Sequence, residues 1–240
     1  MATSQVRTLN ERTHRPVVVV NRMMKPQWHE VFENNPRIAR AVTRNTVQLV
    51  NAGGARPYIV SKSATHWKWR PWDIAPGEIY LSAGENEFAA PYAGRILIEP
   101  HTKVEGSNKS WVWERWQQLV DRGGDFIQVG PHGTVRLDGV EFVETPSFRM
   151  ACAVLAVSRA FVGTEGGLGH AAAALGVPAV VLFSAFISPA VTGYQSHRNI
   201  YKGAFGLGCG ARMPCACCQI SMAAISVDEV ETNLKEILNG

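Results

Sequence analysis

Residues Val162 to Pro178 read VGTEGGLGHAAAALGVP, and the predicted fold depends on the change of pattern within this stretch. An apolar run ends in a turn with three glycines, and an alanine-rich segment follows the turn. A second apolar run extends from Val177 to Phe183. Two short apolar runs joined by a helical segment are typical of parallel strands connected by a helix. The stretch therefore predicts one strand, helix, strand unit of a buried parallel sheet.

The glycine turn is also suited to binding an anion. Gly166, Gly167 and Gly169 carry no Cβ, so their backbone N–H groups can lie close to a ligand. His170 falls in the first turn of the predicted helix, where free amides and the positive end of the helix dipole favour a phosphate. The alternative interpretation is a tight connection that binds nothing, and the turn alone does not decide between the two.

The composition is that of an ordinary globular protein. The chain has 240 residues, of which 46% are hydrophobic and 18% are charged, so it can form one large domain or two small ones. The formal charge of +4 suits an anionic ligand but is too small for a dedicated nucleic-acid binder. No apolar run reaches the roughly 18 to 20 residues of a membrane span, and the polar start of the chain does not resemble a signal peptide. We therefore expect a cytoplasmic protein.

Apolar and amphipathic segments alternate from residue 95 onward, which predicts an α/β fold with a doubly wound, mostly parallel sheet in residues 95–240. Residues 1–94 show shorter elements and are predicted to form a smaller α/β lobe. The predicted elements are strands at 17–20, 57–60, 78–82, 95–99, 126–129 and 141–143, and helices at 37–50, 111–122, 147–159 (capped by Ser147) and 226–238 (capped by Ser226). Residues 85–92 are predicted to be a crossover that is either helical or a loop. Residues 1–12 are expected to be disordered and residues 62–77 to be irregular.

Three further side chains are candidates for function. Lys109 lies in the loop after the first strand of the larger domain, where a mobile positive charge can neutralise a pyrophosphate, although most loop lysines are merely solvated. Glu165 directly precedes the glycines and can either bind a sugar hydroxyl, accept a proton, or cap the following helix. His132 follows a strand and can touch a nucleoside, although a surface role is the simpler interpretation.

Four of the five cysteines are crowded into one segment, at positions 209, 215, 217 and 218. Cys209, Cys215, Cys217 and Cys218 lack the two separated C-x-x-C pairs of a structural zinc site, so reduced thiols are the preferred interpretation and zinc is the alternative. We expect no cofactor. The sequence also lacks the P-loop, G-x-G-x-x-G, G-x-S-x-G and H-E-x-x-H patterns, which disfavours the chemistries that those motifs support.

Several motifs together resemble the heptosyltransferases of glycosyltransferase family 9, which act on ADP-heptose and lipopolysaccharide and have the GT-B fold. The segment FVGTEGGLGH at 161–170, followed by the alanine-rich helix and LGVP, resembles the nucleotide-sugar signature of this family. Lys109-Ser110-Trp111 resembles its Lys-x-Trp motif, and Thr192-Gly193-Tyr194 and the run from Ile225 to Val230 occur in the family's order. The resemblance covers roughly residues 95–238.

The resemblance implies a donor site for a nucleotide-diphosphate sugar. Lys109 would face the diphosphate, the amides of Gly166 and Gly167 would bind phosphate, and His170 would support that anion. Glu165 replaces an aspartate that contacts the donor sugar in the family, and Gly166 replaces a serine or threonine. The resemblance thus implies an inverting, metal-independent transfer to a glycan, lipid-linked or other hydroxyl acceptor, with a peripheral membrane location open.

The first strand of the family ends in a Gly-Asp pair whose aspartate is the general base, whereas here Asn21-Arg22 follows Val20. The candidates for a replacement base are His29, Glu30, Glu85, Glu87 and Glu165. The alternative is a binding module that holds the nucleotide sugar without catalysis. Neither the donor sugar nor the oligomeric state follows from the sequence.

Overall fold

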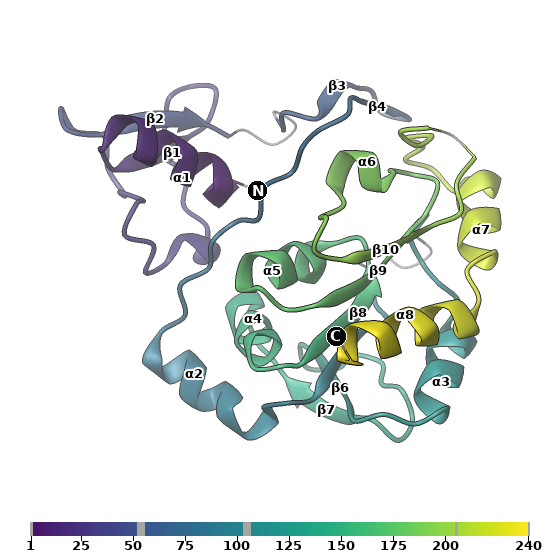
Figure 1. Ribbon diagram of the computed structural model, residues 1–240. Helices are drawn as coiled ribbons and strands as arrows, with labels where there is room; N and C mark the ends of the chain where they lie inside the picture. Colours follow the sequence, from purple (N-terminus) through teal and green to yellow (C-terminus); the bar gives the residue numbers. More distant parts are fainter. Residues whose placement is uncertain (1, 52–55, 103–106, 205, 240) are drawn as a thin grey trace.

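The computed structural model in Figure 1 describes residues 2–51, 56–102, 107–204 and 206–239. Its larger part is a six-stranded parallel sheet in the order β10-β9-β8-β5-β6-β7. The strands are β5 (Ile96–Glu99), β6 (Phe126–Gly130), β7 (Glu141–Glu144), β8 (Ala160–Thr164), β9 (Ala179–Phe183) and β10 (Arg198–Tyr201). The sheet confirms the predicted Rossmann-like α/β fold.

Helices cover both faces of this sheet (Figure 1). They are α3 (Trp113–Asp121), α4 (Phe148–Ala156), α5 (Gly167–Leu175), the short α6 (Pro189–Thr192), α7 (Ala216–Ala223) and α8 (Val227–Asn239). Helices α4 and α5 pack against each other, and α3 packs against α8. None of the helices in the described ranges is long and apolar enough to cross a membrane.

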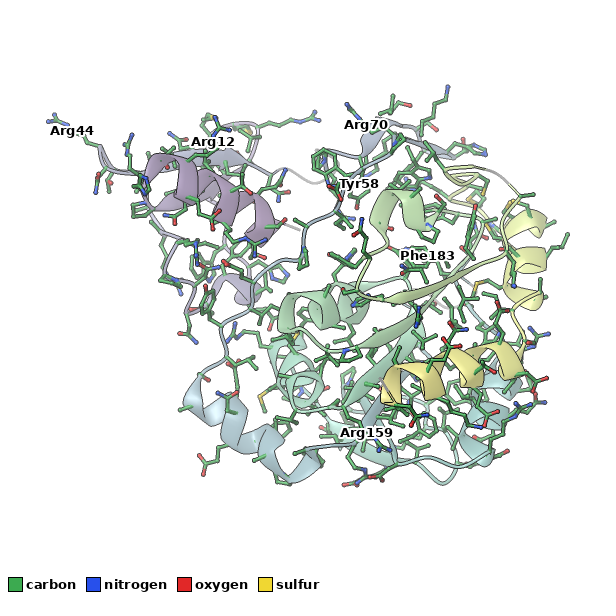
Figure 2. All side chains as sticks on the ribbon, viewed as in Figure 1. Arg12, Arg44, Tyr58, Arg70, Arg159 and Phe183 are labelled. Atoms are coloured by element: carbon green, nitrogen blue, oxygen red, sulfur yellow. The ribbon has the colours of Figure 1, made fainter. Side chains whose placement is uncertain are left out.

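The inner strands β5, β8 and β9 are apolar on both sides because each face of the sheet is buried beneath helices. In β5, Leu97 joins the core beside α4 and α5, whereas its neighbours Ile96 and Ile98 join the core beside α3 and α8. Phe161 of β8 and Phe183 of β9 lie in the first of these cores, and Figure 2 labels Phe183 within the larger part. The predicted caps are also present, since the Ser147 and Ser226 hydroxyls accept from N–H groups of the helices that follow them.

The N-terminal lobe is a small separate layer built on α1 (Ala2–Thr13), β1 (Val17–Val20), the 3-10 turn η1 (Glu30–Phe32) and β2 (Val47–Val50). Strands β1 and β2 are parallel, and Val6, Val17, Val19 and Phe32 form its buried core.

Two predictions for the N-terminal lobe are wrong. Residues 2–13 form a helix and are not disordered, because Val6 and its neighbours on one face pack onto the apolar strand β1. Residues 37–50 are not a helix. A turn closed by the Thr46 N–H to the Thr43 carbonyl leads into β2, where pairing with the fully apolar β1 outweighs local helix propensity.

The segment between the lobe and the sheet contains a hairpin whose first strand overlaps the strand predicted at 57–60 and whose second strand is not predicted. Strands β3 (Ile59–Lys62) and β4 (Trp67–Trp69) are antiparallel, so residues 62–77 are not irregular throughout. Tyr58, labelled in Figure 2 at the entry to β3, and Trp69 are buried in the core beside α4 and α5. The predicted strand at 78–82 is extended chain outside any sheet, since its backbone has no strand neighbour.

Helix α2 (Ala83–Ala89) and the 3-10 turn η2 (Ala90–Tyr92) precede β5, and α2 packs closely against α4. We propose residues 1–94 and 95–240 as the division of the chain, although residues 58–69 and 83–92 contribute buried side chains to the core of the second part.

Strand β10 is not predicted from the sequence. Ile200 is its one buried residue, so the segment RNIY shows no hydrophobic pattern typical of a strand.

Candidate functional site

The glycine turn lies where β8 ends and α5 begins, at the carboxyl edge of the sheet. Open parallel sheets bind ligands at this edge. Gly166 is the residue that precedes the first turn of α5, and it offers no side-chain acceptor to the amides of that turn. A Cβ at Gly166 would meet its nearest neighbour, the Thr164 carbonyl oxygen, at 3.6 Å, which is an ordinary contact. Glycine is therefore not required sterically here, and its effect is to leave the first amides of α5 without a side-chain cap.

Lys109 and Glu165, which are 56 positions apart, form a salt bridge directly beside this helix start. The ammonium group of Lys109 also lies 3.4 Å from the backbone carbonyl oxygen of Glu165 and 5.3 Å from the centre of the Phe186 ring. The Glu165 side chain is 8% exposed and that of Lys109 is 26% exposed. The structure thus brings together two of the side chains that the sequence singles out and places them at the mouth of the sheet.

The Lys109 charge keeps Glu165 ionised despite its burial. Desolvation alone would raise the pKa of the carboxyl group, but the attraction of Lys109 holds that pKa below its usual value. An ionised carboxylate can accept a hydrogen bond from a sugar hydroxyl or a proton from an acceptor. Glu165 does not act as the cap of α5, because no side-chain cap bond is present there.

His170 lies one turn into α5 and is the third member of this group. Its Nε2 atom is 3.7 Å from a Glu165 carboxylate oxygen, and its Nδ1 atom is 3.0 Å from the Tyr194 hydroxyl. Burial lowers the pKa of His170 to about 4, so the imidazole is neutral at neutral pH. His170 can therefore support an anion there as an N–H donor, but not as a cation.

Tyr194 links His170 to a second buried histidine, His197. The ring of Tyr194 is 5.7 Å from that of His170 and 5.3 Å from that of His197, both in edge-on contact. Burial lowers the pKa of His197 to about 4 as well. These three rings line a small cavity of about 10 Å³ beside Glu165, which Thr192 and Asn199 also line.

The two buried histidines predict that acid destabilises the fold. Their folded pKa values of about 4 lie below the ordinary 6.5, so the unfolded chain binds more protons between these values. The contribution of these histidines to the free energy of unfolding should be fully present above pH 6.5. It should fall as the pH drops to 4, by at most about 3 kcal/mol for each histidine. Urea denaturation of His170→Gln and His197→Gln from pH 4 to 7 should each show a shallower fall. The control His132→Gln, on an 89% exposed side chain, should leave the slope unchanged; equal slopes in all variants would contradict the assignment.

His132 is not part of the Lys109, Glu165 and His170 group. It lies in the turn after β6, two strands from β8, and its Nδ1 atom is 3.2 Å from a Glu144 carboxylate oxygen. His132 lies at the same carboxyl edge of the sheet but is exposed to solvent. Its contact with a nucleoside therefore stays a prediction.

Sequence reasoning misses three features near the site. Phe186 lies against Lys109 and comes from a loop with no recognisable pattern. Tyr194 belongs to the Thr192-Gly193-Tyr194 run quoted above, but that run does not predict its hydrogen bond with His170. Glu99 ends the central strand β5 at the same edge, and burial raises its pKa to about 8. An acidic residue that closes the apolar run ILIE is the signal that could have drawn attention to Glu99.

Comparison with solved structures reveals the relationship of this fold. ADP-heptose lipopolysaccharide heptosyltransferase II from E. coli aligns with a TM-score of 0.52 and 19% identity, over 71% of this chain and 56% of that chain. A glycosyl transferase of family 9 from Veillonella parvula aligns with a TM-score of 0.51 and 15% identity, over 68% and 54%. The fold is heptosyltransferase-like. This confirms the resemblance that the sequence motifs indicate at the level of the fold.

The heptosyltransferase-like fold is recognised through structure and not through overall sequence similarity. No protein-family model matches the sequence, and no curated protein matches it either. The chain spans little more than half the length of the two heptosyltransferase-like structures above.

Proposed function

We propose that this chain is a glycosyltransferase that moves a sugar from a nucleotide-diphosphate donor to an acceptor hydroxyl group. The observation that carries the proposal is the meeting of Lys109 with the uncapped start of α5 at the carboxyl edge of β8. A cation and a set of free helix amides at one point are the two groups that bind a diphosphate most effectively. The fold supports the proposal, since it is shared with heptosyltransferases.

In the proposed complex the donor diphosphate lies over the first turn of α5. The amides of Gly166 and Gly167 and the ammonium group of Lys109 stabilise the negative charge that develops as the sugar leaves. Lys109 pairs with Glu165 in the structure, so a bound diphosphate would compete with the carboxylate for the same cation. Glu165 is then released to accept hydrogen bonds from the donor sugar. We propose that the transfer inverts the anomeric carbon and that this charge stabilisation needs no metal ion.

The acceptor hydroxyl must lose a proton, and the candidate bases differ in their suitability. Glu85 is bound by Arg149, and this hydrogen-bonded pair lowers the pKa of Glu85 to about 2, which makes it a weak base. His29 instead accepts the Val31 N–H at the start of η1. Of the candidates, Glu165 is the one that lies at the proposed donor site, and we propose it as the base.

A second candidate function is a module that binds the nucleotide sugar without catalysis. The favouring observation is the lowered pKa of Glu165, because a carboxylate stabilised by Lys109 is a poor proton acceptor. The lobe that precedes the sheet has Asn21-Arg22 where the family resemblance leads one to expect a Gly-Asp pair, and the Asn21 side-chain oxygen accepts the N–H groups of Met23 and Lys25.

A thermal-shift screen of nucleotide sugars tests both candidates. A donor present at 100 times its dissociation constant should stabilise the fold by about 2.7 kcal/mol, which is a rise of about 5–10 °C in Tm for a chain of this size. We expect such a rise with a nucleotide-diphosphate sugar and none with the free sugar. The hit is then incubated with the chain and candidate acceptors, and released nucleotide is measured. Release supports the transferase, binding without release supports the module, and no shift with any nucleotide sugar overturns both.

A further inference from the structure

The four clustered cysteines converge on one point in space. Cys209 follows β10, Cys215 directly precedes α7, and Cys217 and Cys218 lie in the first turn of that helix. The four sulfur atoms all lie within 4.8 Å of one another. The Sγ atom of Cys209 is 3.9 Å from that of Cys215 and 3.5 Å from that of Cys218, and all four side chains are free thiols.

These distances fit a tetrahedral metal site. Four sulfurs placed about 2.3 Å from a single zinc ion at the corners of a tetrahedron are about 3.8 Å apart. The Cys215 and Cys217 sulfurs, at 2.8 Å, are closer than this and need to separate by about 1 Å. Both side chains are partly exposed, which leaves them room to rotate.

The backbone around the cysteines is held from outside the cluster. The N–H of Cys209 donates to the Ala185 carbonyl oxygen over 2.7 Å. Asn108 donates to the carbonyl oxygens of Ala211 and Met213, and its own side-chain oxygen accepts the N–H of Cys215. The segment Cys215-Ala216-Cys217-Cys218 is a local C-x-x-C turn that brings three of the sulfurs together, and these ties to the rest of the fold bring Cys209 to them.

The same loop packs under the β3–β4 hairpin (Figure 1). The N–H of Trp67 donates to the Gly210 carbonyl oxygen, and a Cβ added to Gly210, whose φ is +66°, would collide with the Trp67 carbonyl oxygen. Gly210 is thus required both for its backbone conformation and for this close approach. Such a fixed backbone favours one geometry of the adjacent thiols.

We propose that Cys209, Cys215, Cys217 and Cys218 bind a single zinc or iron ion as thiolates. A set of four thiolates selects these metals over magnesium, calcium or manganese. Binding forms four metal–sulfur bonds and releases the protons of the thiols to solvent, with no change in oxidation state. The amides at the start of α7 favour the negative charge of three of the thiolates. A second C-x-x-C pair is not needed, because Cys209, earlier in the same loop between β10 and α7, completes the set.

The ion would be structural. The cluster ties the loop after β10 to α7, and Asn108 connects that loop to the segment that carries Lys109. Metal that binds only the folded chain stabilises it by an amount that grows with the free metal concentration relative to the dissociation constant. Removal of the ion should therefore lower Tm, whether or not the chain binds a nucleotide sugar.

Elemental analysis of the full chain, purified with reductant and without chelator, tests the proposal. We expect close to one equivalent of zinc or iron per chain, and the element and the visible colour distinguish the two. Cys215→Ser and Cys217→Ser should each lose most of the metal while circular dichroism reports an intact fold. Cys152→Ala is the matched control, because Cys152 is buried in α4 away from the cluster and its loss should leave the metal content unchanged.

Thiol labelling provides a second measurement that does not depend on variants folding. The four cluster cysteines should resist iodoacetamide in the metal-loaded chain and react after treatment with a strong chelator, as identified by peptide mass spectrometry. A chain that takes up no metal after incubation with zinc or ferrous iron and reductant would overturn the proposal. So would unchanged metal content in the Cys215 and Cys217 variants, or disulfides within the cluster of the reduced preparation.

Discussion

Replacing Lys109 with methionine should lower the free energy of unfolding by about 3–5 kcal/mol. The substitution removes the partner of Glu165, whose side chain is 8% exposed, and leaves a carboxylate in a site that solvent reaches poorly. Methionine preserves most of the volume, so the loss reports the unpaired charge and not a cavity. Urea denaturation at pH 7 measures the effect.

The double variant Lys109→Met with Glu165→Gln separates this charge effect from general disruption. With both charges removed, we expect most of the lost stability to return. Lys202→Met is the matched control, since Lys202 pairs with Glu229 on the surface, where side chains are 39% and 30% exposed. Exposed pairs contribute about 0–1 kcal/mol, so the control should change little. Equal losses in Lys109→Met and Lys202→Met would show that the pair at the site is not a buried one.

The same variants separate the effect of Lys109 on the free energy of unfolding from its proposed effect on donor binding. A charged hydrogen bond contributes about 1.5–3 kcal/mol, so loss of Lys109 should weaken donor binding by about 10- to 150-fold. The double variant should regain stability but not donor affinity, because the cation is still absent. Calorimetric titration with the nucleotide sugar found in the thermal-shift screen measures this. Full donor affinity in the double variant would contradict the proposed role of Lys109.

Replacing Arg149 with methionine should produce a second large loss, about 3–5 kcal/mol. Arg149 is buried in α4 and binds both carboxylate oxygens of Glu85 at 2.6 Å. Its remaining N–H groups donate to the carbonyl oxygens of Tyr80, Glu30 and Glu33. One guanidinium group thus joins α4 to α2 and to η1 of the N-terminal lobe.

Arg149→Lys should recover only a small part of this loss, because an ammonium group cannot reproduce the planar, two-pronged contact with Glu85 or reach three carbonyl oxygens at once. Limited proteolysis provides a readout specific to the lobe. Cleavage near residues 21–34 should accelerate in both variants, since η1 loses its contact with α4. The control Arg198→Met removes a surface pair whose side chains are 54% and 53% exposed, and should leave both measurements close to wild type. An unchanged cleavage rate in Arg149→Met would exclude the linking role.

The larger part of the fold could be predicted because its strands follow a simple rule. A strand buried on both faces is apolar throughout, as in AVVLF of β9, and needs no knowledge of its neighbours to be recognised. The N-terminal lobe does not follow this rule. The segment VQLV of β2 is half-exposed and lies after a sequence compatible with a helix, so pairing with β1 decided its structure.

The candidate site shows the same division between local and tertiary information. The glycine turn and the start of α5 are local features, set by residues 162–178 themselves. The salt bridge between Lys109 and Glu165 joins residues 56 positions apart, and the neutral state of His170 results from its burial in the folded chain.

For this protein, the sequence alone determined the parallel sheet, the turn at Gly166 and the identity of the polar groups at its edge, because periodicity and residue type act over a few neighbouring positions. Tertiary structure decided which charges are paired, which histidines are neutral and that four thiols separated by unequal spacings meet at one point. Those properties depend on desolvation and on distances between segments remote in the chain, which no local pattern encodes.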